Sequence, residues 1–286
     1  MKKKLRNDPL FNKLLVVQKP MYMGSNFFLH QVKKKYNSKK AGFSGTLDPF
    51  ATGCLIVAFG QFAKLFNYLN KSPKTYRAVL WLGAVSDSLD IENITHIGSE
   101  KVLNEHTIKE EILNLMGEIN YVPPKFSAKR INGIRAYELA RNGEEIVLKE
   151  STMHILETKF ISYSHPFITF EATVSEGSYI RSLAQILAQR LGVIGTLSHL
   201  HRVREGDFFY ENEKELNPLD YIGLPRNEYT GDKEWVFFGK KIDSYYLSNR
   251  DDGEYLILFD DFFSIIQITN KDVKYLLNKV LLNENE

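Results

Sequence analysis

Residues 42–65, GFSGTLDPFATGCLIVAFGQFAKL, combine a loop rich in glycine and proline with the apolar run CLIVAF. Asp48 precedes Pro49 in this loop, and the residue before a proline is held in the extended region of the backbone. Gly45 and Gly53 stand on either side, where glycine allows a sharp bend or the close approach of another molecule. An Asp-Pro pair most often forms only a turn. The loop therefore leaves two interpretations open: a turn, or a carboxylate presented for chemistry.

The composition is that of a globular protein. The chain has 286 residues, of which 43% are hydrophobic and 25% charged, and this suits one large domain or one large and one small domain. No apolar run approaches the roughly 20 residues of a membrane helix, and the N-terminal run LLVV is too short for a signal peptide. Because Cys54 is the single cysteine, a disulfide framework and a cysteine-based metal cluster are excluded. We expect a protein of the reducing cytoplasm.

Charge is distributed unevenly along the chain. Residues 1–80 contain fifteen Lys and Arg but only two acids, Asp8 and Asp48. Since the whole chain has a net charge of +2, these 80 residues carry +13 and the remaining 206 carry −11. Such asymmetry indicates a polyanionic partner for the N-terminal part. Nucleic acid is favoured over a merely solvated surface, because the cations surround a Gly-rich loop. In this basic field Asp48 is expected to stay ionised.

The hydrophobic periodicity predicts an α+β fold whose mixed, mainly antiparallel sheet is flanked by helices. Predicted strands lie at 13–20, 54–59, 74–83, 152–164 and 166–177. Predicted helices lie at 25–36, 61–69, 107–118, 135–143 and 178–192. Ser25 is the expected N-cap of the first helix.

A polar, turn-rich segment at 211–227 marks a boundary near the C-terminus. Beyond it, 234–242, 254–261 and 262–269 have the pattern of three short strands, followed by a helix-like tail at 271–282. We therefore divide the chain into a main domain at 1–215 and a small C-terminal β appendage at 216–286.

Motifs of several common catalytic sites are absent from the sequence. The seven histidines form no HExxH pattern, and the Gly-rich loop has neither the Gly-Lys-Ser/Thr end of a P-loop nor the spacing of a dinucleotide fingerprint. Asp87, Asp90 and Glu92 in SDSLDIE offer paired carboxylates for acid–base work, but an exposed turn is the favoured interpretation. No metal site is predicted.

Asp48 remains as a candidate nucleophile, because a carboxylate can form a covalent intermediate. Such a group needs a cation to keep it ionised and aligned. Arg181, in EGSYIRSLAQ, is a candidate at the start of a predicted helix, and Tyr179 offers a stacking face beside it. Taken alone, Arg181 would be an ordinary surface arginine.

The stretch GFSGTLDPFATGCLIVAFGQFAKL resembles the signature of the TruB family, the tRNA pseudouridine-55 synthases. In that family a Gly-Thr-Leu-Asp-Pro-x-Ala-Thr-Gly motif carries the catalytic aspartate. Further blocks match in the same order: LLVVQKP at 14–20, KTYRAVLWLGAVSDSLD at 74–90, VPPKFSAKRINGIRAYELARNG at 122–143, SEGSYIRSLAQILAQRLG at 175–192 and GTLSHLHRVREGDF at 195–208. Several collinear motifs over about residues 14–208 are far more specific than any one of them.

The resemblance implies the pseudouridine synthase fold and the isomerisation of uridine 55 in the T-loop of tRNA, after the base is flipped out of the loop. It also implies that no cofactor and no metal are needed. The expected partner is the T-arm of tRNA. The protein is expected to be a monomer that does not associate with a membrane.

The resemblance also implies roles for individual residues. Asp48 is the nucleophile, and Arg181 pairs with it and lowers its pKa. Tyr76 stacks on the flipped base and could move a proton, while Tyr179 and Leu200 form walls of the pocket. The candidate contacts to RNA are Lys19, Pro20, Phe43, Lys64, Arg130 and Arg141.

The chain departs from the family pattern at several positions. Phe43 stands where the family usually has histidine, so an imidazole contact to RNA is lost, although Phe43 could wedge against a displaced base. Tyr22 and Gly24 replace the usual Gly and Thr after Lys-Pro. Residues 174–179, VSEGSY, replace Cys-Ser-Lys-Gly-Thr-Tyr, which removes a cation, and Arg130 replaces lysine. None of these changes touches Asp48, Tyr76 or Arg181.

The C-terminal region and two rival functions stay open at this point. The family usually ends in a PUA-type RNA-binding module, and residues 228–275 are similar to a reduced version whose acidity argues against strong RNA binding. The first rival is a non-catalytic protein that binds or folds tRNA on the same scaffold. The second is a glycoside hydrolase, which needs a second carboxylate near Asp48, whereas Asp8 is the only other acid in residues 1–80.

Overall fold

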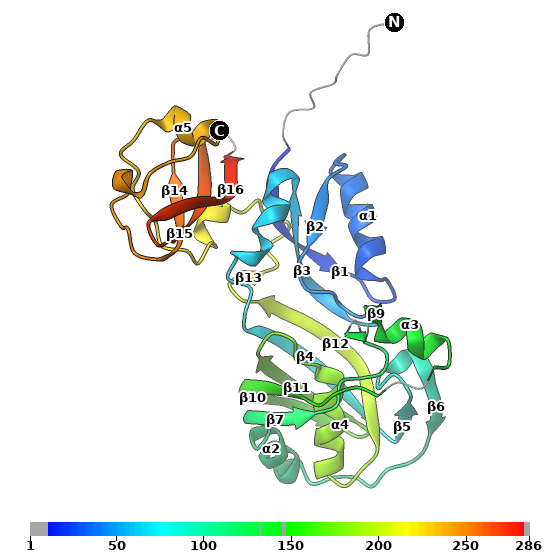
Figure 1. Ribbon diagram of the computed structural model, residues 1–286. Helices are drawn as coiled ribbons and strands as arrows, with labels where there is room; N and C mark the ends of the chain where they lie inside the picture. The colour runs from blue at the N-terminus through cyan, green and yellow to red at the C-terminus, as the bar shows by residue number, and fades with distance from the viewer. Residues whose placement is uncertain (1–10, 128, 132, 145–146, 283–286) are drawn as a thin grey trace, which may run out of the picture.

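The computed structural model of the protein describes residues 11–127, 129–131, 133–144 and 147–282. Its largest feature is a nine-stranded sheet in which seven strands follow the order β1-β3-β12-β4-β11-β10-β7, while β2 pairs with β3 and β13 pairs with β12 (Figure 1). These strands are β1 (Lys13–Lys19), β2 (Ala41–Phe43), β3 (Thr52–Phe59), β4 (Lys74–Leu82), β7 (Gly117–Tyr121), β10 (Ser151–Ser164), β11 (Phe167–Val174), β12 (Gly195–Glu205) and β13 (Phe208–Phe209). The predicted α+β fold is confirmed.

One junction in this sheet differs from all the others. β12 runs parallel to β3 over only two residue pairs, His201 with Thr52 and Arg202 with Gly53. Every other pair in the sheet is antiparallel. The mixed, mainly antiparallel sheet thus consists of two halves, β1-β2-β3 and β12-β4-β11-β10-β7, joined at this short parallel junction.

The larger half buries the face that carries every second residue of β4. Burial alternates along β4, and the side chains of Tyr76, Ala78 and Leu80 lie in the core. These side chains share one apolar cluster with Leu183 and Leu187 of α4 (Ile180–Arg190). α2 (Glu105–Leu113) adds Ile108 and Ile112 to the same cluster. The alternating apolar side chains of β4 and the helically spaced apolar side chains of α4 therefore pack in one core.

The smaller half is covered on both faces, so β1 and β3 are almost continuously apolar. Leu15 and Val57 pack toward α1 (Ser25–Lys35). Leu14 and Ile56 face the opposite way, toward η1 (Gly60–Asn67). η1 is a 3-10 helix where an α-helix is predicted at 61–69.

The remaining short elements of this part lie in the connections of the larger half. They are β5 (Ala84–Ser86), η2 (Ile91–Asn93), β6 (Ile94–Ile97), β8 (Arg130–Ile131), β9 (Ile134–Arg135) and α3 (Ala136–Arg141).

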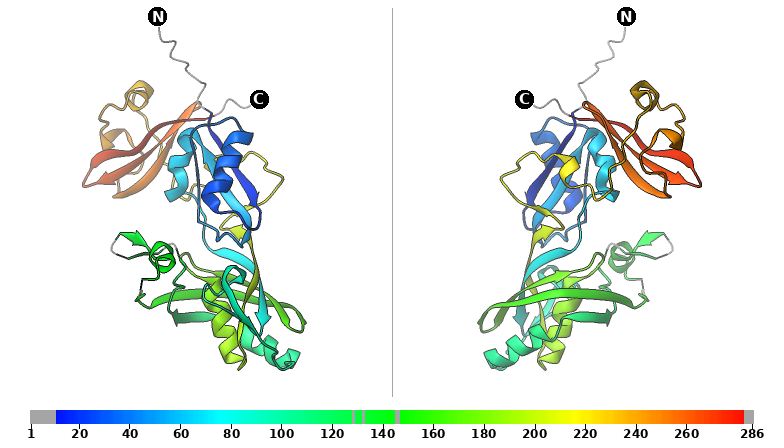
Figure 2. Two further views of the ribbon diagram at one scale, coloured as in Figure 1. Left: turned by 90° about the vertical axis from the view of Figure 1, so that its right-hand side faces the viewer. Right: turned by 90° about the vertical axis from the view of Figure 1, so that its left-hand side faces the viewer.

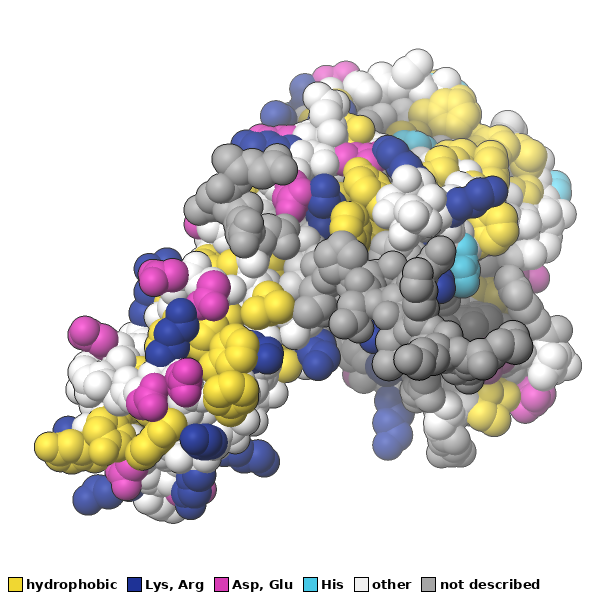
Figure 3. All heavy atoms as spheres, turned by 90° about the horizontal axis from the view of Figure 1, so that it is seen from above, with side chains coloured by type: hydrophobic (Ala, Val, Ile, Leu, Met, Phe, Trp, Pro, Cys, Tyr) yellow, Lys and Arg dark blue, Asp and Glu magenta, His cyan; other side chains and the backbone are white. Residues whose placement is uncertain are grey.

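The C-terminal region is a small unit built on a three-stranded antiparallel sheet. It contains η3 (Pro218–Asp220), α5 (Lys233–Phe237), η4 (Ser244–Tyr246), β14 (Gly253–Leu258), β15 (Phe262–Thr269) and β16 (Asp272–Leu281). Figure 2 shows this unit beside the smaller half of the main sheet, away from α2 and α4. Its surface intersperses apolar side chains with both signs of charge, in the left-hand part of Figure 3.

Two predictions for the C-terminal unit are wrong. The segment 234–242 was expected to be a strand but begins as α5, because the Asp232 side chain caps the helix by accepting a hydrogen bond from the Glu234 amide. The expected helical tail at 271–282 is instead β16. Asn270 and Lys271 both have positive φ and form the two-residue turn of a hairpin between β15 and β16.

The C-terminal unit has a core of its own but also shares one with the main sheet. Phe262 and Ile266 belong to the unit's own cluster, whereas Phe263 and Ile265, on the same strand, belong to the cluster that contains Leu14 of β1. A domain boundary at 215/216 stays a prediction. Within the described ranges, no helix has the length and apolar character needed to cross a membrane.

Candidate active site

A pocket of about 300 Å³ opens where the 43–53 loop meets β4, β12 and the start of α4. Five of the residues predicted to form the site line it, from four separate stretches of the chain: Asp48, Tyr76, Tyr179, Arg181 and Leu200. Both halves of the main sheet contribute to it, because the 43–53 loop leads into β3 while β4, β12 and α4 belong to the larger half.

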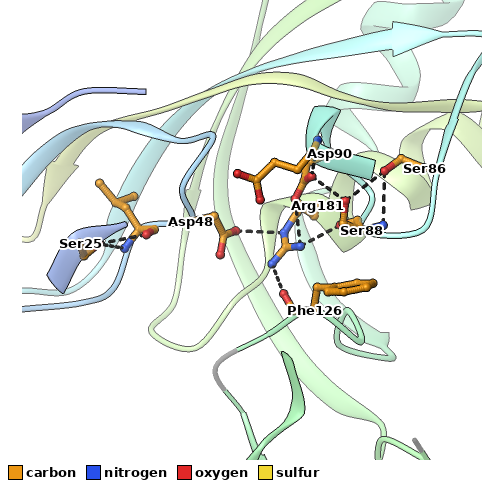
Figure 4. Close-up of polar contacts among 9 residues, drawn as sticks. Ser25, Asp48, Ser86, Ser88, Asp90, Phe126 and Arg181 are labelled. Carbon is orange, nitrogen blue, oxygen red and sulfur yellow. Dashed lines mark hydrogen bonds and ion pairs between the residues drawn. The ribbon is translucent and has the colours of Figure 1, made fainter. Parts of the chain in front are cut away.

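Asp48 and Arg181 form an ion pair in this pocket. Arg181 Nε lies 3.0 Å from Asp48 Oδ2, and the exposed fraction of the side chain is 2% for Arg181 but 33% for Asp48. The carboxylate therefore remains accessible while its cation is buried. Figure 4 shows the two side chains pointing toward each other from the loop and from α4.

The other nitrogens of Arg181 are held by the protein interior. Nη1 donates to the Ser88 carbonyl at 2.8 Å and pairs with Asp90 Oδ2 at 3.1 Å, and Nη2 donates to the Phe126 carbonyl at 2.7 Å. Five-donor guanidinium groups are suited to such fixed, multiple contacts. Arg181 is thus immobilised, and the direction of its Nε toward Asp48 is set by three other partners.

The expectation of an exposed turn at SDSLDIE is wrong for Asp90. Its side chain is 3% exposed, and it accepts hydrogen bonds from the Ser88 hydroxyl and the Glu92 amide. Leu89 has a positive φ of 61°, which turns the chain so that Asp90 points inward. Asp87, in the same segment, is exposed as predicted.

The pKa of Asp48 departs from the predicted direction. Burial raises the pKa of this carboxyl above its ordinary value, and the Asp90 charge adds to the increase. Arg181 and Lys19 act in the opposite direction. Arg181 therefore opposes the increase, as expected for a cation beside an acid, but in the free protein desolvation outweighs it.

The loop that carries Asp48 is fixed on one side by Ser25. The Ser25 hydroxyl donates to the Leu47 carbonyl and accepts from the Leu47 amide, both at 3.0 Å. Ser25 was predicted to cap α1, but the N-cap is Gly24 and has no side-chain bond. The hydroxyl is used instead to hold the residue next to Asp48.

Lys19 fixes the same loop on its other side, and this corrects the prediction that it contacts RNA. The Lys19 side chain is fully buried, and its ammonium donates to the carbonyls of Pro20, Met23 and Pro49 at 2.8, 2.6 and 3.2 Å. All three donors are therefore used, so Lys19 cannot contact a phosphate. Burial lowers the pKa of Lys19 to about 8.

Replacing Lys19 with methionine is expected to destabilise the protein and slow the reaction. The change leaves three buried carbonyl groups without their donor, at about 1–3 kcal/mol for each group that finds no other partner. The loop loses its anchor at Pro49, and the pKa of Asp48 rises further because the Lys19 charge is gone.

Urea unfolding and turnover at several pH values measure both effects of Lys19→Met. Lys101→Met is the matched control, because Lys101 is exposed and its side chain should add nothing to stability. Unchanged unfolding and unchanged turnover in Lys19→Met would show that the three hydrogen bonds do not support the loop.

A buried charged network that the sequence did not reveal forms the far wall of the pocket. Arg202 donates to the carbonyls of Cys54 and Gly45 at 2.8 and 2.9 Å, and its guanidinium lies beside Tyr76. Glu205, fully buried, pairs with Arg202 at 3.1 Å. The only sequence signal was the block GTLSHLHRVREGDF, in which neither residue stood out.

Gly53 is required where the loop enters β3. Its φ is +109°, and a Cβ there would lie 2.3 Å from the Arg202 carbonyl oxygen. Any side chain would push β3 and β12 apart at their parallel junction, so the glycine lets Arg202 approach the loop.

Three other predicted contact residues, Phe43, Pro20 and Lys64, lie outside the pocket lining. Phe43 is half-buried in β2 and packs against the cluster under α1. Pro20 and Lys64 are exposed. Arg130 lies in β8 and Arg141 at the end of α3, but their side chains fall outside the described residues.

Among the described residues, no group of three or more His, Cys, Asp and Glu side chains is arranged to hold a metal ion.

Comparison with known proteins identifies the family to which this chain is similar. The model of the TruB family pseudouridylate synthase N-terminal domain matches residues 33–180. The chain is 55% identical to tRNA pseudouridine synthase B of Sulfurovum sp. (strain NBC37-1), over 94% of this chain and 97% of that protein. It is 52% identical to the protein of the same name from Campylobacter concisus (strain 13826), over 94% and 98% of the two chains.

Among solved structures, the chain is similar to one in the crystal structure of a Cbf5-Nop10-Gar1 complex. The TM-score is 0.64 at 18% identity, over 96% of this chain and 84% of that one. The likeness concerns the fold, and it supports the pseudouridine synthase architecture. From the family model and the full-length relatives together, we conclude that the chain belongs to the TruB family of pseudouridylate synthases.

Proposed function

We propose that the protein is a tRNA pseudouridine synthase that converts uridine 55 of the T-loop to pseudouridine with Asp48 as its nucleophile. The observation that carries the proposal is the accessible Asp48 carboxylate, held 3.0 Å from a buried Arg181 whose Nη1 and Nη2 are hydrogen-bonded to Ser88, Asp90 and Phe126. The chain shares about half of its residues with relatives named tRNA pseudouridine synthase B. As a member of this family, the protein is an isomerase.

The proposed reaction breaks the bond between uracil N1 and the ribose and forms a bond between C5 and the ribose. The C5 proton is lost and N1 gains one, so the atoms balance without an oxidant or a cofactor. The base must leave the folded T-loop before it reaches the pocket. Asp48 attacks the nucleoside and forms a covalent intermediate, and Arg181 keeps the carboxylate directed at it.

The pocket wall around Tyr76 supports the remaining steps. Tyr76, Tyr179 and Leu200 line the space in which a flipped base would lie, and aromatic and apolar groups bind such a base by stacking. The Tyr76 side chain lies beside the Arg202 guanidinium. We assign Tyr76 to stacking on the base and to moving a proton during the exchange at C5.

The glycoside hydrolase alternative is weakened by the position of the second carboxylate. Asp90 is close to Asp48, since both contact the same guanidinium. However, it is buried and held by Arg181 and Ser88. A general acid or base must reach the substrate or a water molecule, and Asp90 has no free path to either.

The test is pseudouridine formation in two tRNA transcripts that differ only at position 55. Purified protein with EDTA and no added cofactor is expected to form one pseudouridine in the transcript with uridine 55 and none in the transcript with cytidine 55. Sedimentation of the protein alone should give the mass of one chain. Tight binding of both transcripts without product would instead favour the non-catalytic tRNA-binding protein.

A further inference from the structure

We propose that Lys71 and Lys74 form a phosphate site at the mouth of the pocket, and that Glu176 occupies this site until RNA binds. The ligand is a phosphodiester next to the flipped nucleotide, in the strand that enters the pocket. The inference rests on the proposed function, because it takes an RNA strand as the substrate.

Lys74 is a largely buried cation that makes only long contacts to carboxylates among the described residues. Its side chain is 9% exposed and lines the pocket. Among the described residues, its closest carboxylate oxygens are Glu205 Oε1 at 3.4 Å and Glu176 Oε1 at 3.8 Å, and neither contact has the geometry of a hydrogen bond. An ammonium carries three donors, and the pocket that Lys74 lines leaves them open to a ligand oxygen.

The two arginines of the pocket lining differ from Lys74 in this respect. Arg181 is held by Asp48, Asp90 and two backbone carbonyls. Arg202 is held by Glu205 and by two backbone carbonyls. Of the cations that line the pocket in the described residues, Lys74 is therefore the one placed to bind a ligand.

The charges around Lys74 favour an anion. Glu205 is fully buried and is shared by Lys74 and Arg202, so these three groups carry one net positive charge. Lys71 adds a second, and its side chain is 21% exposed. Lys74 lines the pocket, and Lys71 lies 3.7 Å from the same Glu176 oxygen that Lys74 approaches. A negative group at this position therefore gains from two cations.

The Glu176 carboxylate occupies the position between Lys71 and Lys74 that we assign to a phosphate. Its Oε1 lies 3.7 Å from Lys71 and 3.8 Å from Lys74, with the side chain 58% exposed. Long, exposed ion pairs contribute little to stability, so this carboxylate is easily displaced. A phosphate in its place would meet both lysines without disturbing Glu205.

The lysines are held in position by the turn after β12. Gly206 has a φ of +59°, and a Cβ there would lie 2.0 Å from the Asn70 carbonyl oxygen and 2.5 Å from Lys71 Cα. The Gly206 amide donates to the Pro73 carbonyl at 2.7 Å. Segment 70–74 is thus packed directly against the end of β12, which carries Glu205.

We assign a phosphodiester to this site because of the way in which a nucleotide would enter the pocket. A nucleotide whose base lies at Tyr76 and whose sugar lies at Asp48 must have its flanking phosphates nearer the mouth. Lysine side chains commonly bind phosphates and set the register of a nucleic acid without reading its sequence. The site would therefore position the target nucleotide in the pocket.

The experiment combines three protein variants with RNA that lacks one charge. The T-arm RNA is prepared unmodified and with a neutral methylphosphonate at the phosphate 5′ or 3′ of uridine 55. Lys71→Gln and Lys74→Gln are expected to weaken binding of the unmodified RNA roughly threefold to tenfold. Each should also reduce the salt slope of log K by about 0.7, the value for one contact to a single strand. Glu176→Gln should strengthen binding, because its amide does not compete with the phosphate.

The neutral linkage identifies the contact directly. At one of the two phosphates beside uridine 55, the methylphosphonate should weaken RNA binding by the wild type and by Glu176→Gln. The same methylphosphonate should weaken binding by Lys71→Gln or Lys74→Gln little further, because the contact is already lost in these variants. Glu105→Gln is the matched control, since it removes the partner of an exposed lysine on α2 and should bind RNA like the wild type. Thermal melting of each variant verifies that it is folded.

The outcomes separate this inference from the proposed function. If the wild type forms pseudouridine but all three variants keep the wild-type affinity and salt slope, the phosphate site is wrong and the proposed function stands. If the neutral linkage and the lysine substitutions weaken RNA binding additively at both positions, the phosphate site is also wrong. If the wild type forms no pseudouridine, the proposed function itself is wrong.

Discussion

Asp48→Asn is expected to abolish pseudouridine formation while tRNA still binds. Asparagine keeps the shape of the side chain but cannot form the covalent intermediate, and loss of a nucleophile lowers kcat by more than about 10⁴-fold in other enzymes. Binding should change little, because most of the affinity for RNA comes from contacts to its backbone. Single-turnover assays with a labelled transcript, together with a filter-binding titration, measure the two properties separately.

Asp87→Asn is the matched control for this change. Asp87 lies in the segment that also carries Asp90, but its side chain is exposed, so the variant should retain full turnover. Pseudouridine formation by Asp48→Asn at more than about a thousandth of the wild-type rate would contradict the nucleophile assignment.

Arg181→Met is expected to reduce both stability and activity. The change leaves the carboxylates of Asp48 and Asp90 facing each other without their shared cation. It also leaves the carbonyls of Ser88 and Phe126 without a donor. Breaking a buried pair by removing one partner typically costs about 3–5 kcal/mol. Turnover should fall because Asp48 is neither aligned nor kept ionised.

The pH dependence of Arg181→Met distinguishes an electrostatic cause from a packing defect. The pKa of Asp48 is already raised by burial, and Arg181 opposes that increase, so the variant raises it further. An acid whose pKa is higher in the folded than in the unfolded protein destabilises the fold above that pKa, and the penalty disappears as it becomes protonated. The stability deficit should therefore shrink as the pH falls, while the acid limb of turnover moves to higher pH.

Urea unfolding at several pH values and a pH profile of kcat measure these shifts. Arg181→Lys is the informative second variant. A lysine keeps the charge but cannot bond four partners in the guanidinium geometry, so it should recover part of the stability and little of the turnover. A deficit in Arg181→Met that is the same at every pH would show that packing alone is responsible.

The sequence predicted the candidate reactive groups more completely than the groups that hold them in place. The motif around Asp48 and the block containing Arg181 were found from resemblance, and the structure brings the two side chains into contact. Asp90 was missed because its inward direction depends on the positive φ of Leu89 and on a partner 91 residues away. No local pattern encodes either feature.

Lys19 and Ser25 were misassigned for a similar reason. A lysine in a basic segment is normally solvated, and a serine before an apolar helix is normally a cap. Here both side chains turn toward the 43–53 loop, where backbone groups need partners. Which polar groups a fold buries is decided by tertiary packing, which one sequence does not show.

In the C-terminal unit, apolar runs alone could not separate helix from strand. The capping residue Asp232 and the turn at Asn270–Lys271 decide between them, and neither feature is part of the apolar pattern. Existence of the unit was predicted, but the type of two of its elements was not.

The parallel junction between β3 and β12 has a consequence for how the reactive geometry is maintained. Asp48 belongs to the smaller half of the sheet, whereas Tyr76 and Arg181 belong to the larger half, and only two residue pairs of ladder join the halves there. A small twist of one half against the other would alter the separation of carboxylate and guanidinium while leaving each half intact. We therefore expect the rigidity of this narrow junction to control whether Asp48, the proposed nucleophile, is in range. Substitutions along it should change the rate without touching a reacting atom.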